Sequence, residues 1–281
     1  MTLLVKGLSH TYNKGLPTEH EALHDISFSV DRGEIVSILG HTGSGKSTLA
    51  QHLNGLAIPQ HGCVIVDDVN TAEHPREGRR MVGLVFQYPE EQIFAENVAE
   101  EVAFAPRNWG VPEKEINEIV LKALNAVGLD ETFLALSPHT LSGGQKRRIA
   151  IASVIAAHPE YIVLDEPTAG LDSKAASDLI NMLRNFAAEK MGIVHITHDI
   201  ELALSISSKI LVLEEGRAVS WASPYETAEM LCTKKIKGLI MPDLLALSAM
   251  LRDAGRIDSL CWDVNTLTEK ICSSFSTEQR G

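Results

Sequence analysis

The stretch GHTGSGKST at residues 40–48 decides the fold of this chain of 281 residues, because its glycines, lysine and hydroxyls follow the pattern of a phosphate-binding loop. The compact apolar run EIVSILG (34–40) leads into it and predicts a buried parallel strand, and a helix can follow over 47–55. Such a turn points successive backbone N–H groups at a phosphate and adds the positive end of a helix dipole. The alternative, a glycine-rich connection without a ligand, is disfavoured because the pattern and both flanking elements agree.

Individual residues of this loop have predicted tasks in binding a nucleotide. Lys46 is expected to reach the β- and γ-phosphates, and the hydroxyl of Ser47 is expected to ligate Mg²⁺. The other residues of the loop are expected to surround the phosphates with backbone N–H groups. The predicted nucleotide-binding residues of the loop are Gly40, His41, Thr42, Gly43, Ser44, Gly45, Lys46, Ser47 and Thr48.

The segment YIVLDEP (161–167) supplies the second half of this site. Its apolar residues carry Asp165 to the carboxyl end of a central strand, where ligands bind in parallel sheets, and this places the carboxylate to hold Mg²⁺. Glu166 is a second carboxylate that can orient and polarise a water for hydrolysis. An apolar strand that ends in two carboxylates is more often an ordinary exit from a sheet, and the phosphate-binding loop upstream reverses that interpretation.

The rest of the chain predicts an α/β fold. Strands and helices alternate after residue 160, which implies a parallel sheet with helices on both faces. Segments 3–8 and 26–30 alternate in the manner of strands, and the middle third is helical, with an apolar face between Ile116 and Val127. Past Val219 the pattern changes to short amphipathic helices, expected after Ser223, over 243–252 and over 265–274.

Composition limits the classes of function. With 44% hydrophobic residues the chain can bury a full core, yet no apolar run approaches the roughly 20 residues of a transmembrane helix. Any role at a membrane is therefore expected to run through a partner. The net charge of -12 argues against a nucleic-acid surface, which needs clustered Lys and Arg. The four cysteines form no CxxC pair, which favours a reduced cytosolic compartment over a zinc site or a disulfide framework.

A third motif selects among the classes of nucleotide-binding protein. LSGGQ (141–145), followed by KRRIAIASVIAAHP, resembles the signature of ABC ATPases, and the resemblance covers residues 1 to about 220. A hydroxyl and bare backbone N–H groups at a helix start form an anion site. In the family this site faces the γ-phosphate of ATP bound by the other protomer. The residues so implied are Leu141, Ser142, Gly143, Gly144 and Gln145.

The resemblance assigns further residues by their positions in matching motifs. Gln87, after the strand VGLVF, matches the glutamine that touches Mg²⁺ and signals to the membrane partner, and Asp172 in AGLD belongs to the loop between protomers. His198 in ITHD matches the histidine that contacts the γ-phosphate. Tyr12 matches the aromatic residue that stacks on adenine, although a tyrosine in a strand is by default a packing residue. The implied catalytic residues are Glu166, His198 and Gln87, and the implied Mg²⁺ ligands are Ser47, Gln87 and Asp165.

The stretch FQYPEEQIFAENVAEEVAFAPRNWGVP (86–112) narrows the resemblance. It looks like the ATPase (A) components of energy-coupling factor transporters, which import vitamins or transition-metal ions in prokaryotes, and is most similar to the second of the two vitamin-type A subunits. The sequence departs from the common pattern at Ala105, usually glycine, and at Asn97, usually threonine.

In this family, the segment after Gln87 receives coupling helices of the transmembrane T component, which present arginines. The glutamates of the segment either supply the matching negative charge or form a solvated acidic helix face, and the sequence leaves both interpretations open. The glutamates concerned are Glu90, Glu91, Glu96, Glu100 and Glu101.

The resemblance also implies architecture and partners. The expected fold is a P-loop ABC ATPase with a mostly parallel core sheet, an N-terminal antiparallel β subdomain and a helical signature subdomain at about 90–158. Residues 1–220 would form the nucleotide-binding domain, and a helical extension at 221–281 would help to pair two ATPases. The expected partners are a second ATPase protomer, a T component and a substrate-binding S component, at the cytoplasmic face of a prokaryotic membrane.

Other functions compete with this assignment. An ABC protein of chromosome maintenance or DNA repair would need a long coiled coil between Lys46 and Leu141, and that stretch is short and has no heptads. A small-molecule kinase or a GTPase is opposed by LSGGQ and by the lack of an NKxD guanine motif. An ABC importer served by a solute-binding protein is the main alternative. The transported substrate is not readable, because in this family a separate subunit chooses it.

Overall fold

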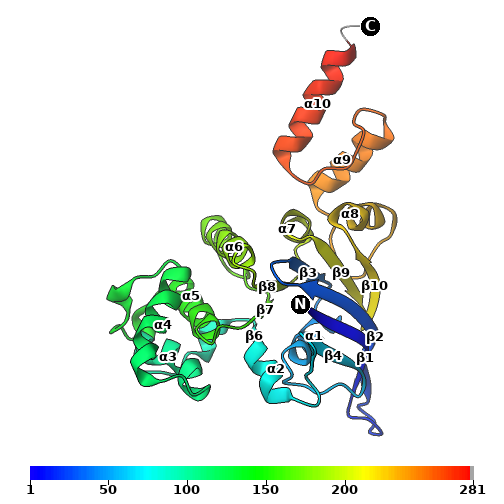
Figure 1. Cartoon of the computed structure of the whole chain (residues 1–281). Coiled ribbons are helices and arrows are strands. Elements are labelled where there is room, and N and C mark those ends of the chain that lie inside the picture. Colours follow the sequence, from blue (N-terminus) through cyan, green and yellow to red (C-terminus); the bar gives the residue numbers. More distant parts are fainter. Residues whose placement is uncertain (279–281) are drawn as a thin grey trace.

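The computed structural model describes residues 1–278 and is built on one mixed sheet of ten strands. Helices surround the sheet and a helical subdomain stands beside it (Figure 1). The strand order is β5 (Val69–Asn70), β4 (His61–Val66), β1 (Thr2–Tyr12), β2 (His20–Asp31), β10 (Arg217–Ala222), β9 (Lys209–Glu214), β3 (Ile35–Leu39), β8 (Gly192–Thr197), β7 (Tyr161–Asp165) and β6 (Val82–Val85).

The directions of the strands divide the sheet into the two parts that the sequence predicts. β1 pairs antiparallel with β2 and with β4, which forms the N-terminal β part. β3, β8, β7 and β6 run parallel to one another, and β9 is parallel to β3. Because the carboxyl ends of parallel strands meet at one edge, the loops after β3, β7 and β8 come together there.

The central strands hold helices on both of their faces. Every residue of β3, β7 and β8 is buried, as parallel strands covered on both sides require. Val36 and Ile38 of β3 share a cluster with Leu49 of α1 (Lys46–Leu53), whereas Leu39 packs with α7 (Ile200–Ile206). α6 (Ser173–Ala188) packs on β8. Alternate residues of one short strand thus fix the two layers that flank the site.

The middle of the chain forms the helical subdomain, drawn in green in Figure 1. The predicted helical face is confirmed, because Ile116, Val120 and Leu124 are buried on one helix and Gly128 follows with φ 73°. The elements of this region are η1 (Pro89–Gln92), α3 (Val98–Asn108), α4 (Glu113–Ala126), η2 (Glu131–Phe133), η3 (Pro138–Thr140) and α5 (Gly143–Ile155). The short helix α2 (Pro75–Met81) precedes it and packs on β5 and β6.

Asn97 is the N-cap of α3, since its side chain accepts the backbone N–H of Glu100 at 2.9 Å. Threonine, which is usual at this position in the resembling family, can perform the same capping task. The departure at Asn97 therefore preserves the start of the helix. Ala105, the other departure, lies on the same helix and lines a groove described below.

The C-terminal region begins with a strand that the sequence analysis missed. β10 lies where a change to helices was expected at Val219, and antiparallel pairing with β9 holds it in the sheet. The expected helices follow as α8 (Pro224–Thr233), α9 (Asp243–Asp253) and α10 (Val264–Glu278). Ser223 is the N-cap of α8, as its position before a proline predicts, and it also forms a capping box with Glu226. α9 and α10 project away from the sheet in Figure 1.

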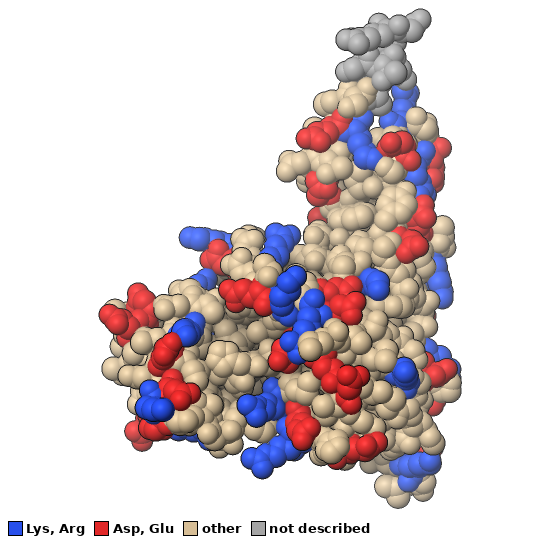
Figure 2. All heavy atoms as spheres, viewed as in Figure 1, with Lys and Arg blue, Asp and Glu red and all other residues tan. Residues whose placement is uncertain are grey.

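The surface carries charges of both signs. Figure 2 shows Lys and Arg interspersed with Asp and Glu over the face that it presents, including the projecting C-terminal helices. Within residues 1–278, no helix combines the length and the apolar character needed to cross a membrane.

Candidate functional site

The phosphate-binding loop connects β3 to α1 at the carboxyl edge of the sheet, as predicted. Gly45 is the N-cap of α1 with φ 102°, and a Cβ at this position would come 2.5 Å from the carbonyl oxygen of Ala22. Only glycine fits both the conformation and the space. Among residues 1–278, no side chain caps the start of α1, so its backbone N–H groups are free to bind an anion.

Lys46 lies folded along this loop. Its Nζ donates hydrogen bonds to the carbonyl oxygens of Gly40, at 2.7 Å, and His41, at 3.0 Å. Burial lowers the pKa of Lys46, while the carboxylates of Glu166 and Asp165 act in the opposite direction. A cation in this position can transfer its hydrogen bonds from the loop carbonyls to phosphate oxygens.

Asp165 and Ser47 meet at the end of β7. The hydroxyl of Ser47 donates to Oδ2 of Asp165 at 2.6 Å. Burial raises the pKa of Asp165, and the Ser47 hydrogen bond and the Lys46 charge partly offset this. Hydroxyl and carboxylate oxygens are ligands that Mg²⁺ prefers, so this pair fits the predicted metal.

Glu166 follows directly and contacts the predicted histidine. Its Oε1 lies 2.8 Å from Nδ1 of His198, which comes one residue after β8. Glu166 is buried and has φ 48°, a left-handed conformation that is uncommon for any residue other than glycine. The neighbouring strands β7 and β8 thus deliver a carboxylate and an imidazole to one point beside the phosphate-binding loop.

These residues surround a cavity of about 260 Å³, which brings most of the predicted nucleotide site together. Tyr12 stands at one side, with its hydroxyl 3.2 Å from that of Thr48 and its ring edge-to-face on His10. The lining residues are Tyr12, His20, Ala22, Thr42, Gly43, Gly45, Lys46, Ser47, Thr48, Gln87, Asp165 and Glu166.

A few residues depart from the prediction. Gly40, His41 and Ser44 do not line the cavity: Gly40 and His41 accept the hydrogen bonds of Lys46, and Ser44 is fully buried. The sequence analysis missed His20 and Ala22. His20 enters because it pairs with Tyr12 between β1 and β2, a register that no local pattern reveals.

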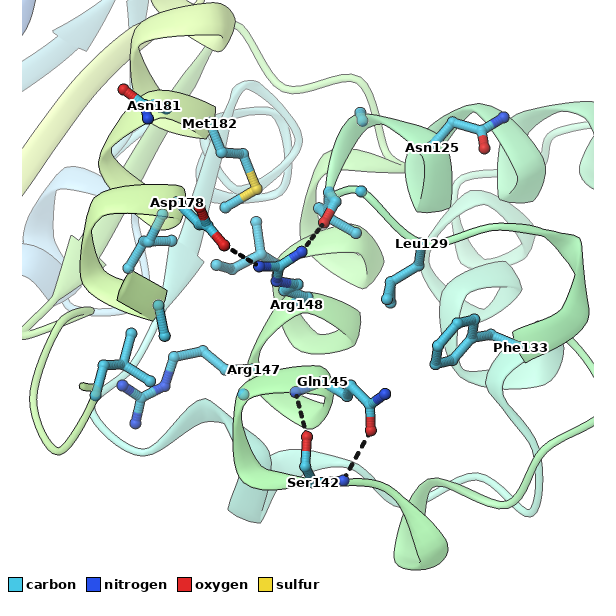
Figure 3. Close-up of a pocket in the computed structure, with 18 of the residues that line it drawn as sticks. Asn125, Leu129, Phe133, Ser142, Gln145, Arg147, Arg148, Asp178, Asn181 and Met182 are labelled. Carbon is cyan, nitrogen blue, oxygen red and sulfur yellow. Dashed lines mark hydrogen bonds and ion pairs between the residues drawn. The ribbon is translucent and has the colours of Figure 1, made fainter. Parts of the chain in front are cut away.

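The signature residues lie elsewhere, at the start of α5. Ser142 accepts the N–H of Gln145 at 3.3 Å, and the Gln145 side chain accepts the N–H of Ser142 at 2.9 Å, which forms a capping box. Ser142, Gly144 and Gln145 line a cleft of about 660 Å³ between α4, α5 and α6 (Figure 3). This cleft shares no lining residue with the nucleotide cavity.

Leu141 and Asp172 support the elements around the signature. Leu141 is half-buried and packs against the core cluster of the helical subdomain. Asp172 caps α6, since its Oδ1 accepts the N–H of Ala175 at 2.8 Å. Neither residue touches the nucleotide cavity of its own chain.

The glutamates after Gln87 have several different environments. Glu101 is 5% exposed and accepts the N–H groups of Phe94 and Ala95, so it is not available to a partner. Glu90 pairs with Arg147 at 3.0 Å, and Glu100 pairs with Arg107 at 2.5 Å. Glu91 and Glu96 are exposed. The segment is therefore not a uniform solvated acidic face, and Glu91 and Glu96 are the glutamates that stay exposed without an ion pair among the described residues.

An apolar groove of about 380 Å³ lies beside these glutamates. Its aromatic lining includes Phe94 and Phe104, which are exposed and pack edge-to-face on each other. Arg79 and Arg80 add positive charge to its rim. Exposed aromatic side chains that line a groove are typical of a surface that binds another protein.

Comparisons with known proteins place the site in a family. The family model described as ABC transporter matches residues 23–169, which is more than half of the chain. The Clostridioides difficile protein named energy-coupling factor transporter ATP-binding protein EcfA2 is 42% identical over 96% of this chain and 95% of its own. The protein of the same name from Geobacillus kaustophilus is 39% identical over 98% of both chains. This chain belongs to the ATP-binding proteins of energy-coupling factor transporters.

Solved structures of other ABC proteins share the fold of this ATPase. The structure of cbiO1 from Clostridium perfringens, part of the ABC transporter complex cbiONQ, gives a TM-score of 0.72 at 36% identity, over 80% of this chain and 89% of that one. The ATP-binding cassette MJ0796, a dimer bound to ADP and Pi, gives 0.70 at 30% identity, over 80% and 99%. This ATPase binds and hydrolyses ATP as a subunit of such a transporter, which confirms the family predicted from LSGGQ and residues 86–112.

Proposed function

We propose that this ATPase works as a pair of protomers that bind ATP between them. The phosphates of each ATP lie between the Lys46 loop of one protomer and the Ser142 helix start of the other. The observation that carries this proposal is the separation of the two anion sites into different cavities of one chain. Each chain holds two half-sites, which a head-to-tail pair completes, with a copy of this chain or a paralogue as the second protomer.

Within each composite site, Ser47, Asp165 and Gln87 would hold Mg²⁺. The metal, when bound, neutralises charge on the β- and γ-phosphates. Glu166 accepts a hydrogen bond from the attacking water and orients it, while His198 holds the Glu166 carboxylate in place and reaches the γ-phosphate. Tyr12 stacks on the adenine, and its contact with Thr48 keeps the ring at the mouth of the cavity.

The site also implies partners in the membrane. The aromatic groove beside Glu91 and Glu96 is the surface on which we place the coupling helices of a T component, with the exposed carboxylates facing their arginines. An S component then selects the cargo, a vitamin or a transition-metal ion. The ATPase is held at the cytoplasmic face of the membrane through these subunits.

The C-terminal extension is proposed to pair the two ATPases. Its helices expose Leu247 and Met250 on α9 and Val264 at the start of α10, which are apolar side chains without cover in a single chain. Because α9 and α10 project from the sheet, a second copy can reach them while the nucleotide sites close (Figure 1).

A Glu166→Gln variant tests the catalytic proposal. The amide keeps the size of the side chain but cannot act as a base, so ATP binding should stay near that of the parent while phosphate release falls at least about 100-fold. Glu118→Gln is the control, because Glu118 is an exposed residue paired with Lys122 on α4. Phosphate release within about twofold of the parent would remove Glu166 from its role.

Purification from membranes tests the choice of transporter. Co-purification of a T and an S subunit with the chain is expected, whereas a solute-binding protein with a different membrane pair would favour the alternative importer. A Phe104→Glu change should release the T subunit, because it places a charge in the aromatic groove. Unaltered co-purification of that variant would move the docking surface elsewhere.

A further inference from the structure

One buried cation in this chain takes no part in the nucleotide site described above. Arg147 lies on α5, five residues after the signature serine, and is 5% exposed. An arginine side chain stays charged at every physiological pH, so its burial requires hydrogen-bond acceptors on all sides. The groups that accept hydrogen bonds from Arg147 indicate its role.

The first acceptor belongs to the segment after Gln87. Nη2 of Arg147 lies 3.0 Å from Oε1 of Glu90, and Nε lies 3.3 Å from Oε2, so the guanidinium and the carboxylate form a two-pronged pair. Glu90 is in η1, three residues after Gln87. The pair thus fixes the turn that begins at Gln87, the predicted Mg²⁺ ligand.

The second set of acceptors belongs to the turn after Glu166. Nη1 of Arg147 donates to the carbonyl oxygens of Pro167, at 3.0 Å, and Ala169, at 2.7 Å. The N–H of Ala169 in turn donates to the carbonyl oxygen of Glu166 at 3.1 Å. This turn holds Glu166 at φ 48°, a conformation that persists only when its surroundings enforce it.

The neighbouring arginine shows that these contacts are particular to Arg147. Arg148 leaves the same helix in another direction, toward Asp178 on α6 at 3.1 Å, and it is partly exposed in the cleft (Figure 3). Arg148 also donates to the carbonyl oxygen of Val127 at 3.4 Å, so it joins α5 to α6 and to the end of α4 near the surface. Arg147 instead joins α5 to the turns after Gln87 and Glu166 inside the protein.

We infer that Arg147 is a positioning residue that ties the turn after Gln87 and the turn after Glu166 to the helix that begins at Ser142. Because α5 is a rigid helix, a displacement of its start by a partner's nucleotide moves Arg147. The guanidinium passes that movement to the Glu166 turn, and through Glu90 to the segment that faces the membrane subunit. The inference rests on the catalytic role proposed for Glu166.

Steady-state ATPase measurements on the full chain test this inference. Arg147→Met should lower kcat at least about tenfold and leave the KM for ATP within about twofold, since Lys46 and its loop are untouched while Glu166 loses its support. The kcat of Arg147→Lys should lie between those of the parent and Arg147→Met. One ammonium group cannot replace the planar guanidinium, which donates to several acceptors at once. Glu90→Gln should lower kcat less than Arg147→Met, because the two carbonyl contacts remain.

A double variant separates positioning from simple stability. Arg147→Met alone leaves Glu90 without its partner, whereas Glu90→Met combined with Arg147→Met leaves no buried charge unpaired. The double variant should have a higher melting temperature than Arg147→Met but keep the lowered kcat. Recovery of kcat together with stability, or normal kcat per folded molecule in Arg147→Met, would overturn the inference.

Two further variants complete the experiment. Glu118→Gln removes a carboxylate from an exposed ion pair of the same subdomain and should match the parent in kcat and KM. Glu166→Gln, measured in parallel, tests the proposed catalytic role by itself. If Glu166→Gln retains turnover while Arg147→Met loses it, the catalytic proposal fails and the Arg147 contacts must act on another group.

Discussion

Two helix starts are proposed to carry the nucleotide chemistry of this ATPase, and they differ in what their backbone N–H groups bind. The start of α1, after Gly45, has no side-chain cap and stands open to phosphate. The start of α5 is closed by the capping box between Ser142 and Gln145. An anion that approaches α5 must therefore compete with a side chain of the same protein.

Gly45 of the phosphate-binding loop and the two glycines of the signature differ in the same way. A Cβ at Gly45 would collide with the backbone of β2, so this glycine serves the packing of its own chain. A Cβ at Gly143 or Gly144 would meet nothing within 4 Å among the described residues. The space beside the signature glycines is therefore open among the described residues, which agrees with the proposed approach of a ligand bound by the partner protomer.

The largest effect that tests the difference between the starts of α1 and α5 is the loss of ATP affinity expected on substitution of Lys46. Lys46→Ala removes the cation of the open site, and ATP should bind to the chain at least about 100-fold more weakly. Ser142→Ala should leave that binding within about twofold, because its site faces another protomer. Titration with a fluorescent ATP analogue at low protein concentration measures both. Equal losses in the two variants would show that one chain uses both motifs on the same nucleotide.

Acid should weaken the sheet that carries the open site. His195 in β8 is fully buried beside Ser37, and burial lowers its pKa to about 4. Between pH 6.5 and about 4 the unfolded chain binds the extra proton, so the free energy of unfolding falls as the pH falls, by about 2 kcal/mol from pH 7 to pH 5. His195→Leu should remove most of this dependence in denaturant titrations at the two pH values. A variant with the slope of the parent would contradict the assignment.

Smaller effects on the ATPase rate and the melting temperature distinguish Gly144 from Gly45. Gly144→Ala should lower the ATPase rate of the assembled pair about tenfold, while the melting temperature stays the same or rises, since alanine favours a helix by up to about 1 kcal/mol. Gly45→Ala should lower the melting temperature, because it forces a clash and an unfavourable φ. Calorimetry and phosphate release measure these effects. A lowered melting temperature for Gly144→Ala would assign that glycine to the packing of its own chain.

The smallest effect concerns the cap of α3, in the subdomain that carries the closed site. Asn97→Ala should lower the free energy of unfolding by about 1 kcal/mol, because the N–H of Glu100 loses its acceptor. Asn97→Thr should stay within about 0.5 kcal/mol of the parent, since its hydroxyl can accept the same bond. Urea denaturation distinguishes the two, and equal losses would show that capping is not what the residue contributes.

Local patterns in the sequence predicted most of the nucleotide site. The phosphate-binding loop, the carboxylates after YIVL and the histidine of ITHD all lie where their motifs indicate, because each is fixed by a strand and the turn that follows it. His20 and the strand β10 were missed, since both depend on pairing between segments far apart in the chain. The sequence treated the glutamates after Gln87 as one acidic group. In the structure Glu101 is buried, whereas Glu91 and Glu96 are exposed.

The sequence by itself determined the chemistry of this protein, because a glycine-rich turn, a carboxylate at a strand end and a serine-glycine helix start act through nearby backbone. Only the tertiary structure decided which charged side chains are paired or hydrogen-bonded inside the molecule. Glu101 accepts backbone N–H groups, and Glu90 is joined to Arg147 and the Glu166 turn. The physical reason is that the partner of a buried charge is set by packing: Arg147 meets Glu90 across 57 residues of chain, and no local pattern of sequence contains both.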